Sequence, residues 1–507
     1  MLHSFLLSLL IWLPVIGAIA VLLTGGDQHA SIARVIAIVV GIANLLLCIP
    51  LYLGFDPNSF AMQFQENYLW IRAYQIHYAV GIDGISLAMI ILTNFTGLLV
   101  ILAGCHAIKI RVAQYMATFL IMQGMIIGVF AATDAILFYV FWEGMLIPMY
   151  LSIGMWGSTN RSYASIKFFL YTFLGSILML VALLYLYNQT GVFEIQKFYG
   201  LNLSLPVQEL LFFAFFLAFA VKVPMWPVHT WLPDAHTEAP SGGSVVLAAL
   251  MLKLGIYGFL RFSMPIAPRA SEELAWFMIV LSLIAIIYIG LVAIVQRDMK
   301  KLIAYSSIAH MGFATLGCFM AYDIIRDTGS YQDAYMSLEG AVVQMIAHAF
   351  GSGAMFLGVG MLADRYYNHS RLINDYGGVA TRMPVFAAFF MLFAMSNVGL
   401  PGTAGFVGEF MVIMSAFQAH FWIGAIAALT LILSASYTLW MYKRIFFGPI
   451  VNEHVAVMQD INWIEKTNYI LLAIGVFWLG LYPGPVLTIL HVTISHLLIQ
   501  SVWGVAA

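Results

Sequence analysis

Long, continuously apolar runs separated by short polar connections are the feature that most constrains this chain. An α-helix needs about 20 largely apolar residues to cross the hydrocarbon core of a bilayer. The chain contains fourteen such runs, at 2–23, 32–54, 82–105, 112–132, 134–154, 166–188, 208–226, 242–264, 274–295, 301–322, 338–362, 383–417, 422–446 and 467–490. Membrane β-strands would instead alternate apolar and polar residues. The sequence therefore predicts an all-α integral membrane protein with about fourteen transmembrane helices.

The composition excludes most other classes of protein. Charged residues make up 9% of the 507 residues, against roughly 25% in an average soluble domain, so they cannot cover the surface of a soluble globule. The net charge of −2 offers no polycationic surface for nucleic acid. Cys48, Cys105 and Cys318 lie in separate apolar runs without ligand or redox spacing, and the sequence has no P-loop or dinucleotide-binding glycine motif. We therefore expect no nucleotide, flavin or iron–sulfur site in this chain.

Lysine and arginine are unequally divided between the two sets of connections, which predicts the orientation. Connections after odd-numbered runs carry 14 of the 21 basic residues, those after even-numbered runs carry five, and two lie inside apolar runs. The odd connections are expected on the cytoplasmic side, and both termini on the other side. The first run lacks a basic leading segment and is expected to be a retained helix. The polar and aromatic stretch 66–78 is expected to be an extramembrane loop.

Five ionisable residues are expected near the middle of the bilayer: Glu143, Lys222, Lys253, His310 and His348. A residue nine or so positions into a helix lies about 14 Å deep, close to the midplane of a core about 30 Å thick. Ionisable groups at this depth are costly and usually functional, although one alone could be a locally satisfied side chain. Because Glu, Lys and His all exchange protons when their surroundings change, the set favours a proton conduit over a structural ion-pair network.

Two of the runs must be interrupted. The seventh contains Pro224 and Pro227 just after Lys222, and the twelfth contains the glycine-rich stretch 397–408 just before Glu409. Proline and repeated glycine do not continue a regular helix. Interrupted helices at corresponding places in two halves are typical of inverted-repeat transporters, with ordinary proline kinks as the alternative. We expect Glu409 to be the sixth member of the buried set, with a wet cavity beside each break.

These interruptions predict four parts in the chain. Runs four to eight (112–264) and nine to thirteen (274–446) would form two five-helix repeats, inverted relative to each other because five is odd. Three N-terminal helices (1–105) would precede them, and a C-terminal helix with a tail (467–507) would follow.

The connection between the seventh and eighth runs carries four polar groups, His229, Asp234, His236 and Glu238. Their spacing matches no standard metal site, so a metal is not expected there. We expect this connection to line a path for proton uptake at the cytoplasmic end. Loop-fixing and helix-capping roles are the alternative for the two carboxylates.

Five segments resemble the antiporter-like membrane subunits of respiratory complex I. They are Phe141–Tyr150, Ala220–Pro240, Leu247–Gly255, Lys300–Gly312 and Gly399–Glu409, and the resemblance is strong from about residue 80 to residue 446. On this resemblance, the proton-transfer positions of the family are occupied by the pair Glu143 and Lys222, the central Lys253, the axis histidines His310 and His348, and the terminal Glu409.

The resemblance implies a proton-translocating subunit of NADH:quinone oxidoreductase, an enzyme of the translocase class. Quinone reduction elsewhere in the complex would drive protons in at the seventh helix, past Lys222 and Lys253, along His310 and His348, and out at Glu409. The chain itself would hold no cofactor or metal, because NADH, FMN, iron–sulfur clusters and quinone would belong to partner subunits.

The resemblance also implies adjacent antiporter-like chains as partners in a bacterial inner membrane, with both termini periplasmic. Glutamate at position 409 distinguishes the chain from family members with lysine there, but also occurs in a related subunit of multisubunit Na⁺/H⁺ antiporters. That antiporter is the alternative function, and an inert membrane scaffold is a third.

Overall fold

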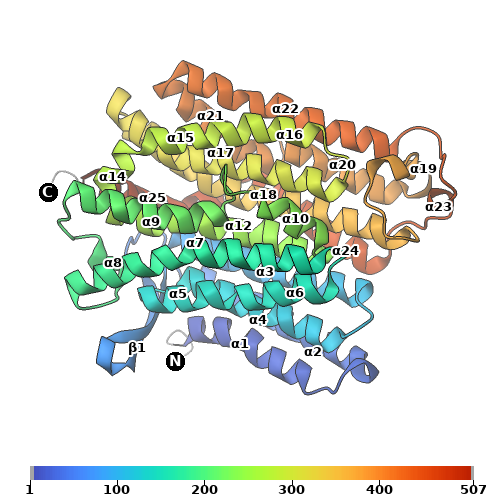
Figure 1. Ribbon diagram of the computed structural model, residues 1–507, viewed down its shortest axis with the longest axis horizontal. Coiled ribbons are helices and arrows are strands. Elements are labelled where there is room, and N and C mark those ends of the chain that lie inside the picture. The colour runs from blue at the N-terminus through green and yellow to red at the C-terminus, as the bar shows by residue number, and fades with distance from the viewer. Residues whose placement is uncertain (1–4, 504–507) are drawn as a thin grey trace.

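The computed structural model describes residues 5–503 as an elongated helical bundle with a small β-hairpin at one end (Figure 1). The chain first forms α1 (Leu6–Leu22), α2 (Ala30–Leu53), β1 (Gln63–Ile71), β2 (Ile76–Ile82), α3 (Gly84–Ala107), α4 (Val112–Ala131), α5 (Ala135–Gly144), α6 (Leu146–Trp156), α7 (Arg161–Thr190), α8 (Ile195–Phe198), α9 (Leu205–Lys222) and α10 (Trp231–Glu238). It continues with α11 (Ser241–Val246), α12 (Leu252–Gly258), α13 (Met264–Ile266), α14 (Pro268–Glu273), α15 (Ala275–Ile284), α16 (Gly290–Ile294), α17 (Met299–Thr328), α18 (Tyr331–Arg365), α19 (Val379–Arg382), α20 (Pro384–Val398), α21 (Ala404–Ala419), α22 (Phe421–Phe446), α23 (Glu453–Ala456), α24 (Trp463–Leu481) and α25 (Gly484–Trp503).

Short helical segments of other types join these elements. Three π-helical segments, η4 (Leu247–Met251), η5 (Phe259–Ser263) and η6 (Ala285–Ile289), connect α11 to α12, α12 to α13 and α15 to α16. Three 3₁₀ turns lie in connections, at Asp27–His29, Arg72–Tyr74 and Ile373–Asp375. The helix that carries Lys253 therefore has a π-helical segment on either side of α12.

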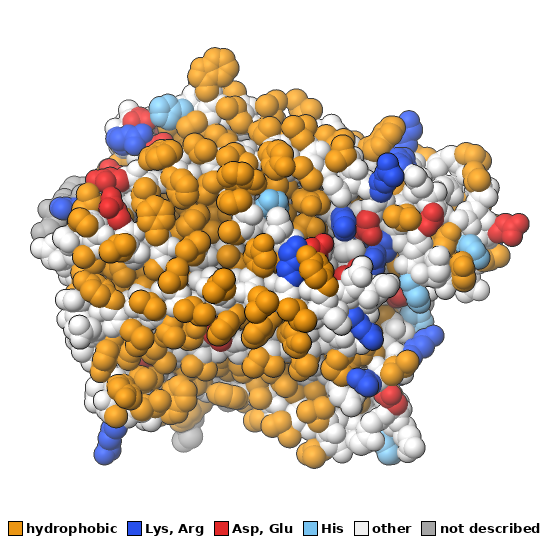
Figure 2. All heavy atoms as spheres, in the orientation of Figure 1, with side chains coloured by type: hydrophobic (Ala, Val, Ile, Leu, Met, Phe, Trp, Pro, Cys, Tyr) orange, Lys and Arg blue, Asp and Glu red, His pale blue; other side chains and the backbone are white. Residues whose placement is uncertain are grey.

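The surface has the distribution of polarity expected of a membrane protein. Within residues 5–503, thirteen helical stretches are long and apolar enough to cross a membrane, and α1, α20 and α21 are shorter apolar helices. Figure 2 shows hydrophobic side chains covering the middle of the molecule, whereas Lys and Arg gather toward the end where α19 and α23 lie. The predicted all-α membrane fold is confirmed.

The long helices α17 and α18 form the centre of the bundle. They contain 30 and 35 residues. In the most apolar 18-residue stretch of each helix, 94% and 100% of the residues are buried within the protein. Only 33% is buried in α2, α7 and α22, which leaves these helices to face lipid. His310 on α17 and His348 on α18 are thus buried inside the protein.

The stretch 66–78, predicted to be a loop, is a β-hairpin. Strands β1 and β2 pair antiparallel, with Leu69 opposite His77. The buried carboxylate of Glu66 accepts hydrogen bonds from the backbone N–H groups of Leu7 (3.0 Å) and Ser8 (3.1 Å), which fastens the hairpin to the start of α1. Register shifts interrupt the pairing, so the two-residue alternation that reveals a strand is lost in the sequence.

The run 467–490, predicted to be one span, is two helices. The first, α24, ends at Leu481 because Pro483 has no backbone N–H with which to continue it. The second, α25, packs against the start of α3, where the Gly84 N–H donates to Thr493 Oγ1 (2.9 Å). A Cβ at Gly84 would lie 1.8 Å from the Ile489 carbonyl oxygen, so the two helices touch through backbone. Because the residues on both sides of Pro483 are apolar, the length of the apolar run did not separate α24 from α25.

The fifth run, 134–154, is also interrupted. It divides into α5 and α6 at Met145. Pro148 cannot donate to the Gly144 carbonyl, and its ring crowds that carbonyl. The interruption places Glu143 in the last turn of α5.

Candidate proton-transfer site

The predicted break after Lys222 is present. Helix α9 ends at that residue, and the chain becomes helical again at Trp231, after Pro224 and Pro227. The carbonyl of Val221, which has lost its helical partner, accepts a hydrogen bond from the indole Nε1 of the buried Trp231 (2.9 Å). The side chain that starts α10 thus satisfies the end of α9 and fixes the position of Lys222.

Glu143 and Lys222 are neighbours without direct contact. The Glu143 carboxylate accepts a hydrogen bond from Ser176 Oγ on α7. Lys222 is 1% exposed, and its Nζ lies 5.2 Å from the Trp142 ring centre and 5.9 Å from that of Phe168. Among the residues described, none accepts a hydrogen bond from this ammonium, although the charge of Glu143 acts on it. The aromatic rings and the carboxylate therefore share the stabilisation of the charge.

Lys253 and His348 form a direct hydrogen bond in the centre of the protein. Lys253 is fully buried on α12, and its Nζ lies 2.6 Å from Nδ1 of His348 on α18. The same Nζ donates to the carbonyl of Ala248, which lies in the π-helical segment η4. An ammonium has donors only, so with Lys253 charged His348 accepts at Nδ1 and carries its proton on Nε2.

His310 and Glu409 continue this line from His348. The rings of His348 and His310 have centres 5.7 Å apart, and His310 Nδ1 lies 3.0 Å from Glu409 Oε1. That contact is close enough for an ion pair but is not aligned as a hydrogen bond. Glu409 is 1% exposed, and Oε1 accepts from Gln344 Nε2 (3.1 Å).

The structure thus brings four of the six predicted residues into one line in the order Lys253, His348, His310, Glu409. The sequence prediction named His310 before His348, whereas the structure places His348 beside Lys253 and His310 beside Glu409. Depth along a helix can be counted from sequence, but the direction of each ring depends on how α17 and α18 pack. The pair Glu143 and Lys222 lies on α5 and α9, apart from this line.

The predicted interruption before Glu409 is also present, between α20 and α21. Gly399 has φ +81° and Gly402 has φ +88°, in the left-handed region that favours glycine. Asn397 on the last turn of α20 donates to Ser306 Oγ (3.1 Å) and Thr438 Oγ1 (3.0 Å), which joins the broken helix to α17 and α22. The break therefore has a fixed geometry around the carboxylate.

The connection 229–243, predicted to be a polar loop, contains the helix α10 and is largely buried. Asp234 pairs with Lys167 on α7 (2.7 Å), and Glu238 accepts from the backbone N–H of Asn160 (2.9 Å). His236 is fully buried and stacks on Phe356, with ring centres 4.3 Å apart. The two carboxylates thus hold neighbouring segments, and of the four predicted groups His236 is the one that is fully buried.

A charged cavity opens at the end of the bundle opposite the hairpin. It measures about 590 Å³, and Asp298, Lys300, Asp364 and Arg371 contribute its charged lining. The Lys300 side chain is buried at its inner side, where Nζ donates to the Ala239 carbonyl (2.7 Å) just after α10. In residues 5–503, no group of three or more His, Cys, Asp or Glu side chains is arranged to hold a metal ion.

Comparison with known proteins places this geometry in a family. Residues 132–434 match the family described as "NADH:quinone oxidoreductase/Mrp antiporter, TM". The match covers more than half of the chain and includes all six candidate residues. The chain belongs to this family.

Relatives and solved structures of this kind match nearly the whole chain. The NADH-quinone oxidoreductase subunit M of Rhodobacter capsulatus is 46% identical, over 97% of this chain and 96% of its own length. A chain of respiratory complex I from Thermus thermophilus with bound NADH superimposes with a TM-score of 0.87 at 28% identity, covering 97% of this chain and 99% of that one. The Mrp complex from Dietzia sp. DQ12-45-1b shares the fold, with a TM-score of 0.83 at 20% identity and 98% coverage of both chains.

In this member of the NADH:quinone oxidoreductase/Mrp antiporter family, two basic residues lie inside the protein although the sequence did not predict it. Lys300 and Arg261 were both assigned to connections that set the orientation, but both are held inside the protein. Lys300 directly precedes Lys301 near the start of α17, and Lys300 is buried whereas Lys301 is partly exposed. Arg261 lies two turns after Lys253 on the same helix, which was the signal for its inward position.

Gly399→Ala is expected to disturb the Glu409 carboxylate as well as the backbone. A Cβ at this position would lie 2.6 Å from Glu409 Oε2 and would occupy a left-handed conformation, which costs roughly 1–2 kcal/mol for an L-residue. We expect reduced assembly and a loss of proton transfer greater than the loss of assembled protein, measured by native gel and by proton uptake into vesicles. Gly329→Ala is the matched control, because Gly329 has φ +68° with nothing within 4 Å of its Cβ position. Equal effects of the two substitutions would assign the loss to backbone strain alone.

Proposed function

We propose that this chain is a proton-translocating membrane subunit of NADH:quinone oxidoreductase. The observation that carries the proposal is the buried line from Lys253 through His348 and His310 to Glu409. It joins the centre of the bundle to the interrupted helix, and each member can accept and release a proton. The relatives that match along the whole chain bear the name of this oxidoreductase.

Proton movement along the line follows from the chemistry of each group. Charged Lys253 donates to His348 Nδ1, and His348 then releases a proton from its other ring nitrogen, Nε2, toward His310. His310 delivers a proton to the Glu409 carboxylate at 3.0 Å. Neutral Glu409 then releases its proton at the break between α20 and α21. The Lys–His pair is within direct transfer distance, whereas the histidine pair needs a side-chain rotation or a bridging water.

In this proposal, Glu143 controls the charge of Lys222 and does not carry the proton onward. A carboxylate close to Lys222 stabilises the ammonium form, and a carboxylate that moves away leaves the buried charge to be released. Ser176 holds Glu143 in the position near Lys222. We propose that redox energy from the partner subunits acts by changing this distance.

Uptake is proposed to begin at the charged cavity. Lys300 forms its inner side and donates to Ala239, and His236 lies on the helix that ends just before Ala239. The charges of Lys253 and Lys300 both act on His236. In this proposal, the buried imidazole of His236 lies between Lys300, where a proton arrives, and Lys253, where the line begins.

The assembly and location complete the proposal. The chain works beside adjacent antiporter-like chains, and NADH, FMN, iron–sulfur clusters and quinone bind to partner subunits, so that no redox centre resides in this chain and the complex acts as a translocase. The end that carries the charged cavity faces the cytoplasm of a bacterium, and both termini face the periplasm, because the basic connections gather at the cavity end. The two five-helix repeats, 112–264 and 274–446, would contribute the interruptions beside Lys222 and Glu409, respectively.

Lys222→Met and Glu143→Gln are expected to lower NADH-driven proton pumping by tenfold or so, equivalent to about 1.4 kcal/mol in the barrier. Each removes one charge of the pair and keeps the side-chain volume. Proton uptake into inverted vesicles, measured with NADH oxidation in the same sample, reports the effect. Lys443→Met is the matched control, because Lys443 lies at the end of α22 beside Trp440. Normal pumping in both variants would favour a scaffold, and Na⁺-driven proton exchange without NADH would favour the antiporter.

A further inference from the structure

The helix that carries Lys253 also carries a buried charge closer to the hairpin end. Tyr257 lies one turn after Lys253 within α12, and Arg261 follows in the π-helical segment η5. Arg261 Nε donates to the Tyr257 hydroxyl (3.3 Å), and the guanidinium lies 5.2 Å from the centre of that ring. Arg261 is thus placed on the route from Lys253 to the hairpin end, about 12 Å further along the helix axis.

Asp83 holds Arg261 in this position. Arg261 NH2 lies 2.6 Å from Asp83 Oδ2, and the two side chains are 13% and 5% exposed. The other carboxylate oxygen, Oδ1, caps α3 by accepting the backbone N–H of Ser86 (2.9 Å). Ser86 Oγ in turn contacts the Tyr257 hydroxyl (3.0 Å) and Arg261 NH2 (3.3 Å). The guanidinium is therefore fixed by three partners from two helices.

A cavity lies beside Arg261 at the hairpin end. Its volume is about 40 Å³, and its lining includes Asp83, Tyr257, Arg261 and His496. A single water needs about 10–15 Å³, so the cavity has room for more than one. The path from this cavity to Lys253 then runs past Arg261 and the Tyr257 hydroxyl.

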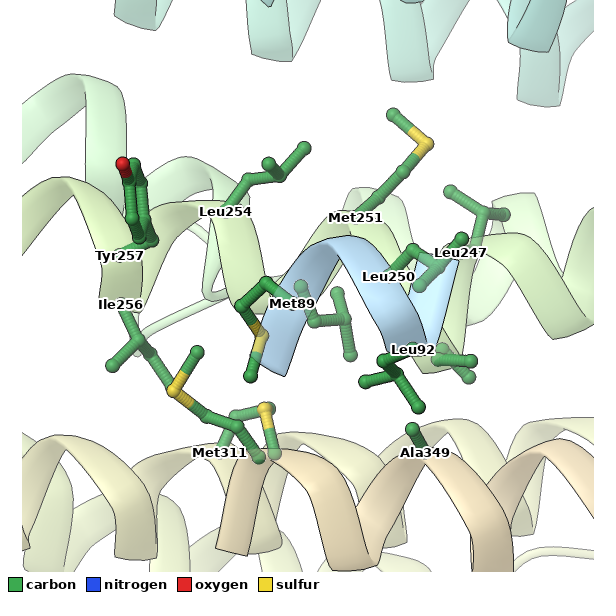
Figure 3. Close-up of a cluster of buried hydrophobic side chains, with 14 of the residues drawn as sticks. Met89, Leu92, Leu247, Leu250, Met251, Leu254, Ile256, Tyr257, Met311 and Ala349 are labelled. Atoms are coloured by element: carbon green, nitrogen blue, oxygen red, sulfur yellow. The ribbon is translucent and has the colours of Figure 1, made fainter. Parts of the chain in front are cut away.

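Apolar side chains fill the space around this path. Figure 3 shows Met89, Leu254, Ile256 and Met311 in the cluster that contains Tyr257. A proton that left Lys253 in this direction would have to pass the hydroxyl and then the guanidinium.

We propose that Arg261, held by Asp83, is an electrostatic barrier that prevents protons from leaving Lys253 directly to the hairpin side. An arginine does not release its proton in a protein, so it cannot relay one, and its fixed positive charge repels protons as arginines do in selective pores. The inference rests on the proposed function, in which Lys253 carries protons on their way to Glu409. Without the barrier, Lys253 would connect the two sides of the membrane without passing along the line.

Arg261→Met is the test, made in the intact complex reconstituted into vesicles. A pH gradient is imposed in the absence of NADH, and its decay is followed with a pH-sensitive dye inside the vesicles. We expect passive proton conductance, normalised to the amount of assembled complex, to rise by tenfold or so, equivalent to about 1.4 kcal/mol of barrier. Arg261→Lys keeps a positive charge beside Asp83 but can release its proton, so it is expected to leak less than Arg261→Met.

Arg365→Met is the matched control for the loss of a buried ion pair. Arg365 NH2 lies 2.6 Å from Glu465 Oε2, with exposures of 15% and 10%, at the start of α24. Its loss is expected to weaken assembly without a leak. Conductance equal to that of the unsubstituted complex in Arg261→Met would overturn the barrier, as would an equal leak in Arg365→Met.

A double variant separates failure of the barrier from failure of the proposed function. Adding Lys253→Met to Arg261→Met is expected to remove the leak, because the leak passes through Lys253. A leak that persists in the double variant would show a path that avoids Lys253 and would overturn the inference. If Arg261→Met does not assemble, Arg261→Gln gives the same readout, because the amide removes the guanidinium charge and can still donate a hydrogen bond to Asp83. A tight membrane in an assembled Arg261→Gln complex would then overturn the proposal.

Discussion

Lys253→Met is expected to reduce proton pumping by more than tenfold, a loss above about 1.4 kcal/mol of transition-state stabilisation. Lys253 supplies the hydrogen bond to His348 Nδ1 at 2.6 Å, and in its absence His348 has no donor from the uptake side. Methionine fills nearly the same volume without a charge, so the packing of this fully buried site is retained. The effect should therefore be on proton transfer and not on folding.

The measurement compares proton uptake with NADH oxidation in the same vesicles. A lower ratio of protons to electrons in a fully assembled complex is the expected result. Lys167→Met is a suitable control, because Lys167 pairs with Asp234 at 2.7 Å and does not belong to the line. Pumping by Lys253→Met at the rate of the unsubstituted complex would remove Lys253 from the path.

Glu409→Gln is expected to have an effect of similar size. The amide matches the carboxylate in shape and can still accept from Gln344, which contacts Oε1 at 3.1 Å, but it cannot receive a proton from His310. Because the residues act in series, the double variant Lys253→Met with Glu409→Gln should be no worse than either single variant. Initial rates of proton uptake in the three variants give this comparison.

Glu339→Gln is the matched control for a buried carboxylate. Glu339 lies on α18 near the hairpin end, accepts a hydrogen bond from Tyr335, and is 7% exposed. It is not part of the line, so its amide should pump normally. Additive losses in the double variant, beyond either single loss, would show that Lys253 and Glu409 serve separate paths.

Much of the fold could be predicted because lipid imposes simple rules. Run length and the scarcity of charge indicated the helices, and the prolines and glycines around Lys222 and Glu409 indicated the two interrupted helices. The hairpin could not be seen in the same way, because its pairing is irregular and most of β1 is exposed. Helix α25 was hidden by apolar residues on both sides of Pro483.

The candidate site could be predicted residue by residue but not as a connected arrangement. Lys253 and His310 were identified by depth, a property of one helix. The order of His348 and His310, and the distance between Glu143 and Lys222, depend on how different helices pack. Arg261 was placed with the connections because charge counting cannot recognise a partner such as Asp83, which is 178 positions away.

The four groups of the line come from four different helices: α12, α18, α17 and α21. Their critical separations are 2.6 Å between Lys253 and His348 and 3.0 Å between His310 and Glu409, and a hydrogen bond is lost when such a distance grows by about 0.5–1 Å. A displacement by a fraction of one side-chain diameter is therefore enough to interrupt the path. A small slide of one helix is enough to break these contacts, and the packing of α17 against α18 sets the gap that a side-chain rotation or a bridging water must span between His348 and His310.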